Sequence, residues 1–158
     1  MTSPQPSPAS RPQNPDDAAL FDAVAAEHAT IYGYGFVSAH SFPDVNELVS
    51  DSLNNHRDLR EAAIAMLSAR SVTPPIAAVG YQLPMPVANA TDAATLAVRM
   101  EEDDAVAWRA VLEQVKTAQD RDFAVKALTG CAVRAARWRQ VLHAWPVTTA
   151  FPGGSEQA

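Results

Sequence analysis

The sequence predicts an all-α fold, an antiparallel four-helix bundle with one long crossover between its second and third helices. Three observations support it: four segments repeat apolar residues at helical spacing, the connections between them are short, long and short, and no segment alternates like a strand. At 158 residues the chain suits one domain with a sizeable core. We expect this domain at 16–145, between a Pro-rich disordered tail at 1–15 and a second disordered tail at 146–158.

The first two helices should form a hairpin. Leu20 and Val24 begin an apolar repeat that predicts a helix over about 16–40. Pro43, which suits a first helical turn, follows a short break and opens the second helix, at about 43–70. The short break between the two helices makes them antiparallel neighbours.

The second pair of helices follows a long connection. Residues 71–90 contain four prolines and have no helical period, so we expect a crossover. The third helix should cover about 92–116 with Thr91 as its cap, and after a short joint at 117–120 the last helix should end near Ala144. A single long connection between the second and third helices is expected in one known bundle topology.

Composition excludes several classes of function. A formal net charge of −6 argues against nucleic-acid binding, which depends on neutralising phosphates with Lys and Arg. The single cysteine excludes an internal disulfide framework and a thiolate cluster for zinc or iron–sulfur. Neither a signal peptide nor a membrane-spanning stretch of about 20 apolar residues can be recognised. We therefore expect a cytoplasmic protein that contacts neither membrane nor nucleic acid.

Each predicted helix carries one ionisable residue on or beside its apolar stripe. These residues are Glu27, His56, Glu101 and Arg134. A buried charge is costly unless it is paired or bound to a metal. Four such residues that converge in one bundle therefore indicate either a site or a polar network that locks the core. By the same count Glu27 falls at the edge of its stripe, and His28 lies nearer the centre.

Four segments of the sequence can be compared with known families: AAEHATIYGYG (25–35), NNHRD (54–58), GYQLPMPV (80–87) and MEEDDAVAW (100–108). They resemble an alanine-rich ferritin-like family of unknown function, and the similarity extends over about 16–145. The resemblance implies a ferritin-like bundle and no assigned activity.

Di-iron proteins of this superfamily use a Glu on each of two helices and a Glu-x-x-His pair on each of the other two. The matching residues here are Glu27, Leu53 with His56, Glu101, and Cys131 with Arg134. Leucine cannot ligate a metal, and arginine is a permanent cation. Our first hypothesis is a degenerate, metal-free and non-catalytic site, in which Arg134 bridges the two glutamates and the protein has a structural or interaction role.

An alternative hypothesis is a ferritin-like enzyme or sensor with one metal ion. Two carboxylates and an imidazole, from Glu27, Glu101 and His56, suit iron, manganese or zinc. His28 is a weak fourth ligand, because adjacent helical residues diverge by about 100°. Cys131 is expected to be a small buried hydrophobe, although a nucleophile paired with His56 is an alternative. Binding of a small molecule by the same residues is a third alternative.

The remaining features have structural interpretations. Tyr32, Tyr34, Trp108 and Trp138 are expected to fill the core, with a redox path as the alternative. The acidic run at 101–104 should face arginines of the last helix, with Glu102 and Asp103 in solvent. For partners we expect a homodimer or another protein on an exposed face, and the Pro-rich 71–90 loop is an alternative binding surface.

Overall fold

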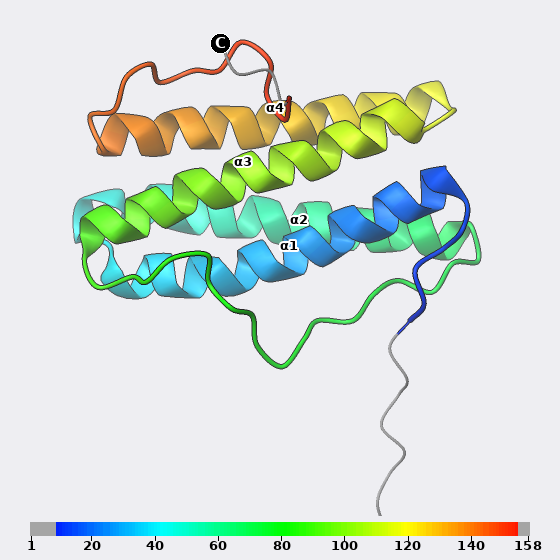
Figure 1. The fold of residues 1–158 in the computed structure, drawn as a ribbon, viewed down its shortest axis with the longest axis horizontal. Coiled ribbons are helices and arrows are strands. Elements are labelled where there is room, and N and C mark those ends of the chain that lie inside the picture. The colour runs from blue at the N-terminus through cyan, green and yellow to red at the C-terminus, as the bar shows by residue number, and fades with distance from the viewer. Residues whose placement is uncertain (1–8, 155–158) are drawn as a thin grey trace, which may run out of the picture.

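The protein is a four-helix bundle in a computed structural model that describes residues 9–154 (Figure 1). The predicted tails lie partly outside the described residues, at 1–8 and 155–158. The elements are α1 (Pro15–His40), a short 3₁₀ helix η1 (Pro43–Val45), α2 (Asn46–Ala69), α3 (Ala90–Gln114) and α4 (Ala118–Val141). The described residues contain no strand. The all-α prediction is therefore confirmed, with helix ends within a few residues of those expected.

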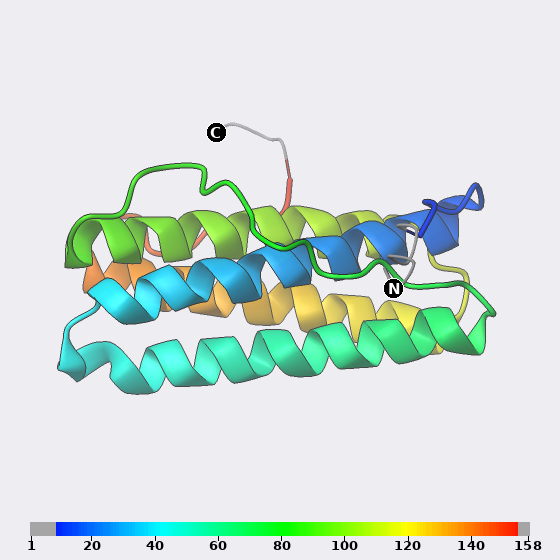
Figure 2. The same ribbon diagram turned by 90° about the horizontal axis from the view of Figure 1, so that it is seen from below.

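Two helical hairpins lie side by side along the bundle. α1 packs against α2, α3 packs against α4, and α1 also packs against α3. The connection between α2 and α3 returns along α1 to the opposite end of the bundle, as Figure 2 shows. The two hairpins therefore start at opposite ends of the bundle, and α2 runs in the same direction as α3.

Side-chain caps begin three of the helices. Asn14, Asn89 and Thr117 have extended backbones, and each side-chain oxygen accepts a hydrogen bond from a backbone N–H of the first turn. Thr91, the cap expected from the sequence, lies inside α3 instead. Asn89 takes its place because its oxygen reaches the Asp92 N–H at 2.9 Å. Similarly, Thr117 is a cap and not part of a loose joint.

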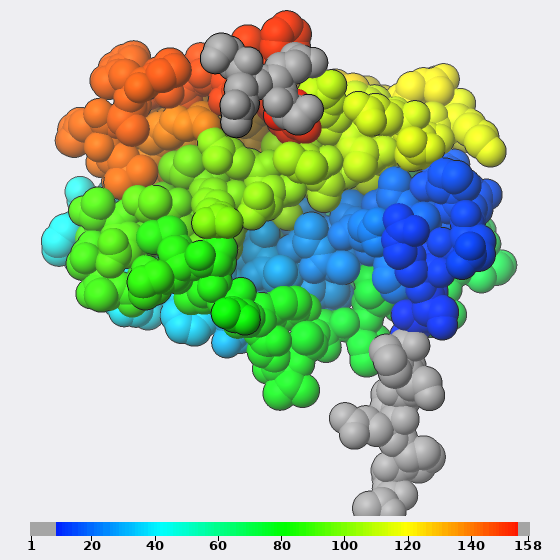
Figure 3. Space-filling view, in the orientation of Figure 1, coloured from blue at the N-terminus to red at the C-terminus, as the bar shows by residue number. Residues whose placement is uncertain are grey.

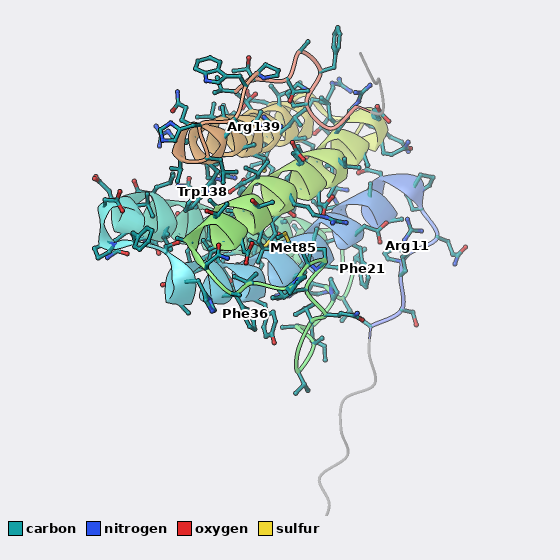
Figure 4. The ribbon with its side chains drawn as sticks, turned by 60° about the vertical axis from the view of Figure 1, so that its left-hand side comes forward. Arg11, Phe21, Phe36, Met85, Trp138 and Arg139 are labelled. Carbon is teal, nitrogen blue, oxygen red and sulfur yellow. The ribbon has the colours of Figure 1, made fainter. Side chains whose placement is uncertain are left out.

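The core has two apolar clusters, one toward each end of the bundle. One cluster contains Leu20, Val24, Leu67, Trp108 and Val111, together with Phe21 and smaller side chains. The other contains Tyr34, Val37, Val49, Leu96 and Trp138, with Phe36 and Met85 packed against it (Figure 4). Five buried ionisable side chains lie in neither cluster. No helix of the described residues is long and apolar enough to cross a membrane.

A cluster of ion pairs connects three helix ends at one end of the bundle. Arg70, at the carboxyl end of α2, donates to Asp16 at 2.7 Å and Asp17 at 3.0 Å, and to Asp120 at 2.9 Å. The aspartates lie in the first turns of α1 and α4, where the helix dipole favours negative charge. One guanidinium therefore links α1, α2 and α4 at one end of the bundle.

Two long segments cover the outside of the helices. In the crossover, the Tyr81 ring packs against Tyr32 of α1, with ring centroids 5.4 Å apart, and the Val79 side chain is exposed. After α4 the chain turns back over α3 and α4 (Figure 3). There Arg139 Nη1 donates to the Val147 carbonyl at 3.0 Å. At Gly153, with a φ of 70°, an added Cβ would meet the Ala105 carbonyl, so only glycine fits this close approach.

Candidate functional site

The four ionisable residues singled out in the sequence meet in the middle of the bundle. Glu27, His56 and Glu101 have no exposed surface, and Arg134 is 8% exposed. They come from α1, α2, α3 and α4 respectively. Each of the four side chains lies on the face of its helix that points toward the bundle axis. The four residues lie at similar heights along this axis, so their side chains form one connected group. Glu27 is therefore fully buried, although the sequence placed it at the edge of its stripe.

His56 lies at the centre of this group and contacts carboxylates with both ring nitrogens. Its Nδ1 is 2.8 Å from Glu27 Oε2, and its Nε2 is 3.0 Å from Glu101 Oε1. Burial lowers the pKa of His56, but hydrogen bonds to Glu101 and Glu27, together with their charges, outweigh burial and raise this pKa to about 10. In this arrangement the imidazole is a cation that donates to two carboxylates.

Each glutamate is also held by an aromatic side chain. The indole N–H of Trp108 donates to Glu27 Oε1 at 2.7 Å, on the oxygen that does not face His56. The Tyr34 hydroxyl donates to Glu101 Oε1 at 2.5 Å, and accepts a hydrogen bond from the Trp138 indole at 3.0 Å. These aromatic residues thus fill the core as expected and also fix the glutamates. Tyr32 differs, since it is 36% exposed and lies outside this network.

Arg134 contacts Glu101 and does not bridge the two glutamates, so this part of the first hypothesis was wrong. Its Nε lies 3.0 Å from both Glu101 oxygens, and its Nη2 lies 3.3 Å from the Cys131 sulfur. Glu27 is bonded to His56 and Trp108 instead. Each glutamate therefore has its own cation, His56 for Glu27 and Arg134 for Glu101, while His56 also links the two.

Asp104 is a member of the site that the sequence analysis missed. It is 1% exposed, and its Oδ2 lies 3.4 Å from His56 Nδ1. That oxygen has no hydrogen-bond partner, although it is buried. Burial and the nearby charge of Glu27 raise the pKa of Asp104 well above its usual value. The available signal was its spacing, because a residue three positions after Glu101 lies on the same helical face.

Three donors converge on one point in this core. One carboxylate oxygen from each of Glu27 and Asp104 and one ring nitrogen of His56 lie within 4.8 Å of one another. All three residues are buried. Oxygen and imidazole nitrogen donors suit iron, manganese and zinc. Glu101 was expected to be the third donor, but its carboxylate is engaged by Arg134, Tyr34 and His56.

The residues do not fit a dinuclear iron centre. Leu53 packs with the apolar residues around Val49, and Arg134, at the position expected from the sequence to match the second histidine, is an arginine bound to Glu101. Burial raises the pKa of the Cys131 thiol well above its usual value, so the sulfur stays protonated and is a poor ligand. A second metal ion would find a guanidinium in place of ligands. The chemistry available is therefore that of one small buried centre.

The second-tier residues have other roles. His28 is half-buried and its Nε2 lies 3.2 Å from the Pro75 carbonyl of the crossover, so it faces away from the centre. Burial lowers the pKa of His28 below its usual value. Cys131 is completely buried in the first apolar cluster. A cavity of about 200 Å³ lies between α3, α4 and the C-terminal segment, and Glu101 is among the residues around it, although this side chain has no exposed surface.

The chain belongs to a family described as a domain of unknown function, DUF4439, whose model matches residues 19–156. It is also similar to a protein of known structure, the conserved hypothetical protein rv2844 from Mycobacterium tuberculosis. The two sequences are 63% identical, with a TM-score of 0.81 over 82% of this chain and 98% of the other. No match was found among curated proteins. Neither similarity assigns a function to the buried centre.

Proposed function

We propose that this protein is a ferritin-like bundle that binds a single divalent transition-metal ion through Glu27, His56 and Asp104. The ligands differ from those expected in the sequence analysis, because Asp104 takes the place of Glu101. The ion would be iron, manganese or zinc, the metals that accept a mixed set of oxygen and imidazole nitrogen donors. Such an ion would join α1, α2 and α3 and stabilise their packing, as expected of a structural or sensing site.

The observation that carries this proposal is the unpartnered Oδ2 of Asp104. A buried carboxylate oxygen without a donor is costly, and buried polar atoms are almost always satisfied. This oxygen lies 3.4 Å from His56 Nδ1, which is also the nitrogen that faces Glu27. A cation placed among these three atoms would satisfy Asp104 and give each atom a partner.

The surroundings of the three donors also support the proposal. Metal-binding histidines commonly donate their second N–H to a carboxylate, and metal-binding carboxylates are themselves hydrogen-bonded. Here His56 Nε2 faces Glu101, and Trp108 holds the Glu27 oxygen that points away from the centre. When an ion is bound, His56 would lose the proton on Nδ1 and keep Nε2–H donating to Glu101, so the Nδ1 lone pair would be available to the ion.

A metal-free protein with a structural or interaction role is the second candidate. The observation that favours it is that both ring nitrogens of His56 lie within hydrogen-bond distance of a glutamate. A protonated His56 then satisfies both glutamates, and a protonated Asp104 leaves two anions and two cations in the core. In this case the function would lie on the surface, for example in a homodimer contact or in the 71–90 loop with its exposed Val79.

Metal content separates the two candidates. The protein would be purified untagged and without chelators, incubated with Fe²⁺, Mn²⁺ or Zn²⁺ in turn, and analysed by elemental mass spectrometry. We expect about one ion per chain in the wild type and in Asp103→Asn, since Asp103 is exposed. Asp104→Asn should lose the ion, because an amide is a much weaker ligand.

A wild-type protein that stays substoichiometric with every ion would contradict the metal proposal and favour the metal-free candidate. Loss of the ion in both aspartate variants would also contradict it, because exposed Asp103 should have no part in binding. Thermal unfolding provides an independent readout, since an ion that binds only the folded state raises its stability.

A further inference from the structure

Arg134 is the one permanent cation in the buried centre. Its Nε is held at 3.0 Å from both oxygens of Glu101, and the side chain is almost entirely buried. Guanidinium groups remain protonated in proteins, so this charge is present whatever else is bound. Gly130 leaves room for the group, because a Cβ there would lie 3.1 Å from Arg134 Nη1. The helix thus accommodates a cation beside the proposed metal ligands.

The formal charges of the proposed metal-bound centre balance for a divalent ion. A ligating His56 is neutral, because its lone pair is used for the metal. The carboxylates of Glu27, Glu101 and Asp104 contribute three negative charges, and Arg134 contributes one positive charge. A divalent ion therefore brings the net charge to zero. A trivalent ion leaves one uncompensated positive charge in a site with little exposure to water, which is unfavourable.

We infer that Arg134 makes the centre selective for one divalent ion and against trivalent ions. The inference rests on the proposed function. Arg134 does not touch the donors of Glu27 or Asp104 and acts through Glu101, so it is a positioning residue. The expected consequence of the Arg134 charge is that a bound ion stays divalent and is not oxidised to the trivalent state.

The geometry around Glu101 explains how Arg134 can act at a distance. Glu101 Oε1 accepts from Tyr34 and lies 3.0 Å from His56 Nε2, while Arg134 holds both oxygens of the same carboxylate. The anchored carboxylate keeps the His56 ring turned so that Nδ1 faces Glu27 and Asp104. Loss of the contact between Arg134 and Glu101 should weaken the binding of divalent and trivalent ions equally. A change in the ratio of their affinities therefore measures the effect of the Arg134 charge alone.

The test compares two redox-inactive ions, Zn²⁺ and Ga³⁺. Their affinities would be measured by competition with a chelator of known constants, and the quantity of interest is the ratio of the two affinities. Arg134→Met should shift this ratio toward Ga³⁺ by about tenfold or more. Without the positive charge of Arg134, the three carboxylates balance all three positive charges of the gallium ion. Arg134→Lys, which keeps the charge, should retain the wild-type ratio. Arg137→Met, an exposed arginine of the same helix, is the matched control.

A paired substitution keeps the test decisive if Arg134→Met alone does not fold. Glu101→Gln removes one anion and should shift the ratio toward Zn²⁺. Arg134→Met combined with Glu101→Gln removes both charges together and should return the ratio to the wild-type value. An unchanged ratio in Arg134→Met, or a double variant that departs from the wild-type ratio, would overturn the inference. Failure of the wild type to bind Zn²⁺ at all would instead refute the proposed function.

Discussion

The indole nitrogen of Trp108 lies 2.7 Å from Glu27 Oε1, although 81 residues separate the two in the chain. The other oxygen of Glu27 faces His56, so the carboxylate is divided between a neutral donor on α3 and an imidazole on α2. A large apolar side chain therefore also determines which oxygen of Glu27 is available to the centre.

Trp108→Phe should test this division. Phenylalanine keeps most of the packing but removes the indole N–H, which leaves Glu27 Oε1 buried without a donor. We expect a loss of about 1–3 kcal/mol in the free energy of unfolding, measured by urea denaturation. Trp145→Phe is the matched control, because Trp145 is 81% exposed. Equal effects of the two substitutions would contradict a specific role for the Trp108 hydrogen bond.

Arg134→Ala should be one of the most damaging single substitutions in the chain. It leaves Glu101 buried without its cation, and breaking a buried pair from one side costs about 3–5 kcal/mol. Chemical denaturation measures this cost, with Arg137→Ala as the exposed comparison. A loss below about 1 kcal/mol would mean that water reaches Glu101 in the folded protein.

The pH dependence of stability should reflect His56 in protein stripped of metal. Its pKa is about 10 in the folded state against an ordinary value of 6.5, so the folded state binds this proton more tightly. The stabilisation is therefore complete below about pH 6.5 and is lost as the pH rises toward 10, by an amount on the order of a few kcal/mol. Urea midpoints measured across this range should fall.

His56→Gln provides the comparison for that profile. Glutamine has no titrating group, so the fall between pH 6.5 and 10 should be markedly smaller in this variant than in the wild type. The raised pKa of Asp104 acts in the same direction at lower pH, because burial and Glu27 favour its protonated form. A wild-type profile that is flat between pH 6.5 and 10 would exclude a charged His56.

Arg70→Ala should loosen one end of the bundle. The substitution removes the cation that Asp16, Asp17 and Asp120 share, and these partly buried carboxylates then repel one another. We expect a loss of about 1–2 kcal/mol, since a network contributes more than an isolated surface pair. Arg57→Ala, at an exposed position of the same helix, should have little effect. If salt is raised to 1 M, the difference between the two variants should shrink.

Apolar periodicity was sufficient to predict the four helices, the long crossover and the inward direction of His56, Glu101 and Arg134, but it placed Glu27 only at the edge of its stripe. It worked because each helix buries one face, and the spacing of residues on a face is a property of the helix alone. Helix ends were less certain. Thr91 resembled a cap, but Asn89 begins α3 because its side chain reaches the Asp92 N–H.

Asp104 is a buried residue that apolar periodicity did not predict. Within the acidic run 101–104, Glu102 and Asp103 were expected in solvent, and Asp104 was expected only to face arginines of the last helix. The structure buries Asp104 as well, because α3 packs against both α1 and α4 and therefore hides a wider face than one stripe. The width of the buried face depends on neighbouring helices, which no single helix encodes.

The sequence by itself determined which residues form helices, most of the side chains that face inward, and that the ligands of a dinuclear iron centre are incomplete. Only the tertiary structure decided which side chains form pairs. Arg134 pairs with Glu101, His56 lies between two glutamates, and Asp104 Oδ2 has no hydrogen-bond partner. The physical reason is that periodicity is local, whereas a pairing depends on how far each helix is shifted and rotated against the others. Those shifts are set by the packing of the whole core.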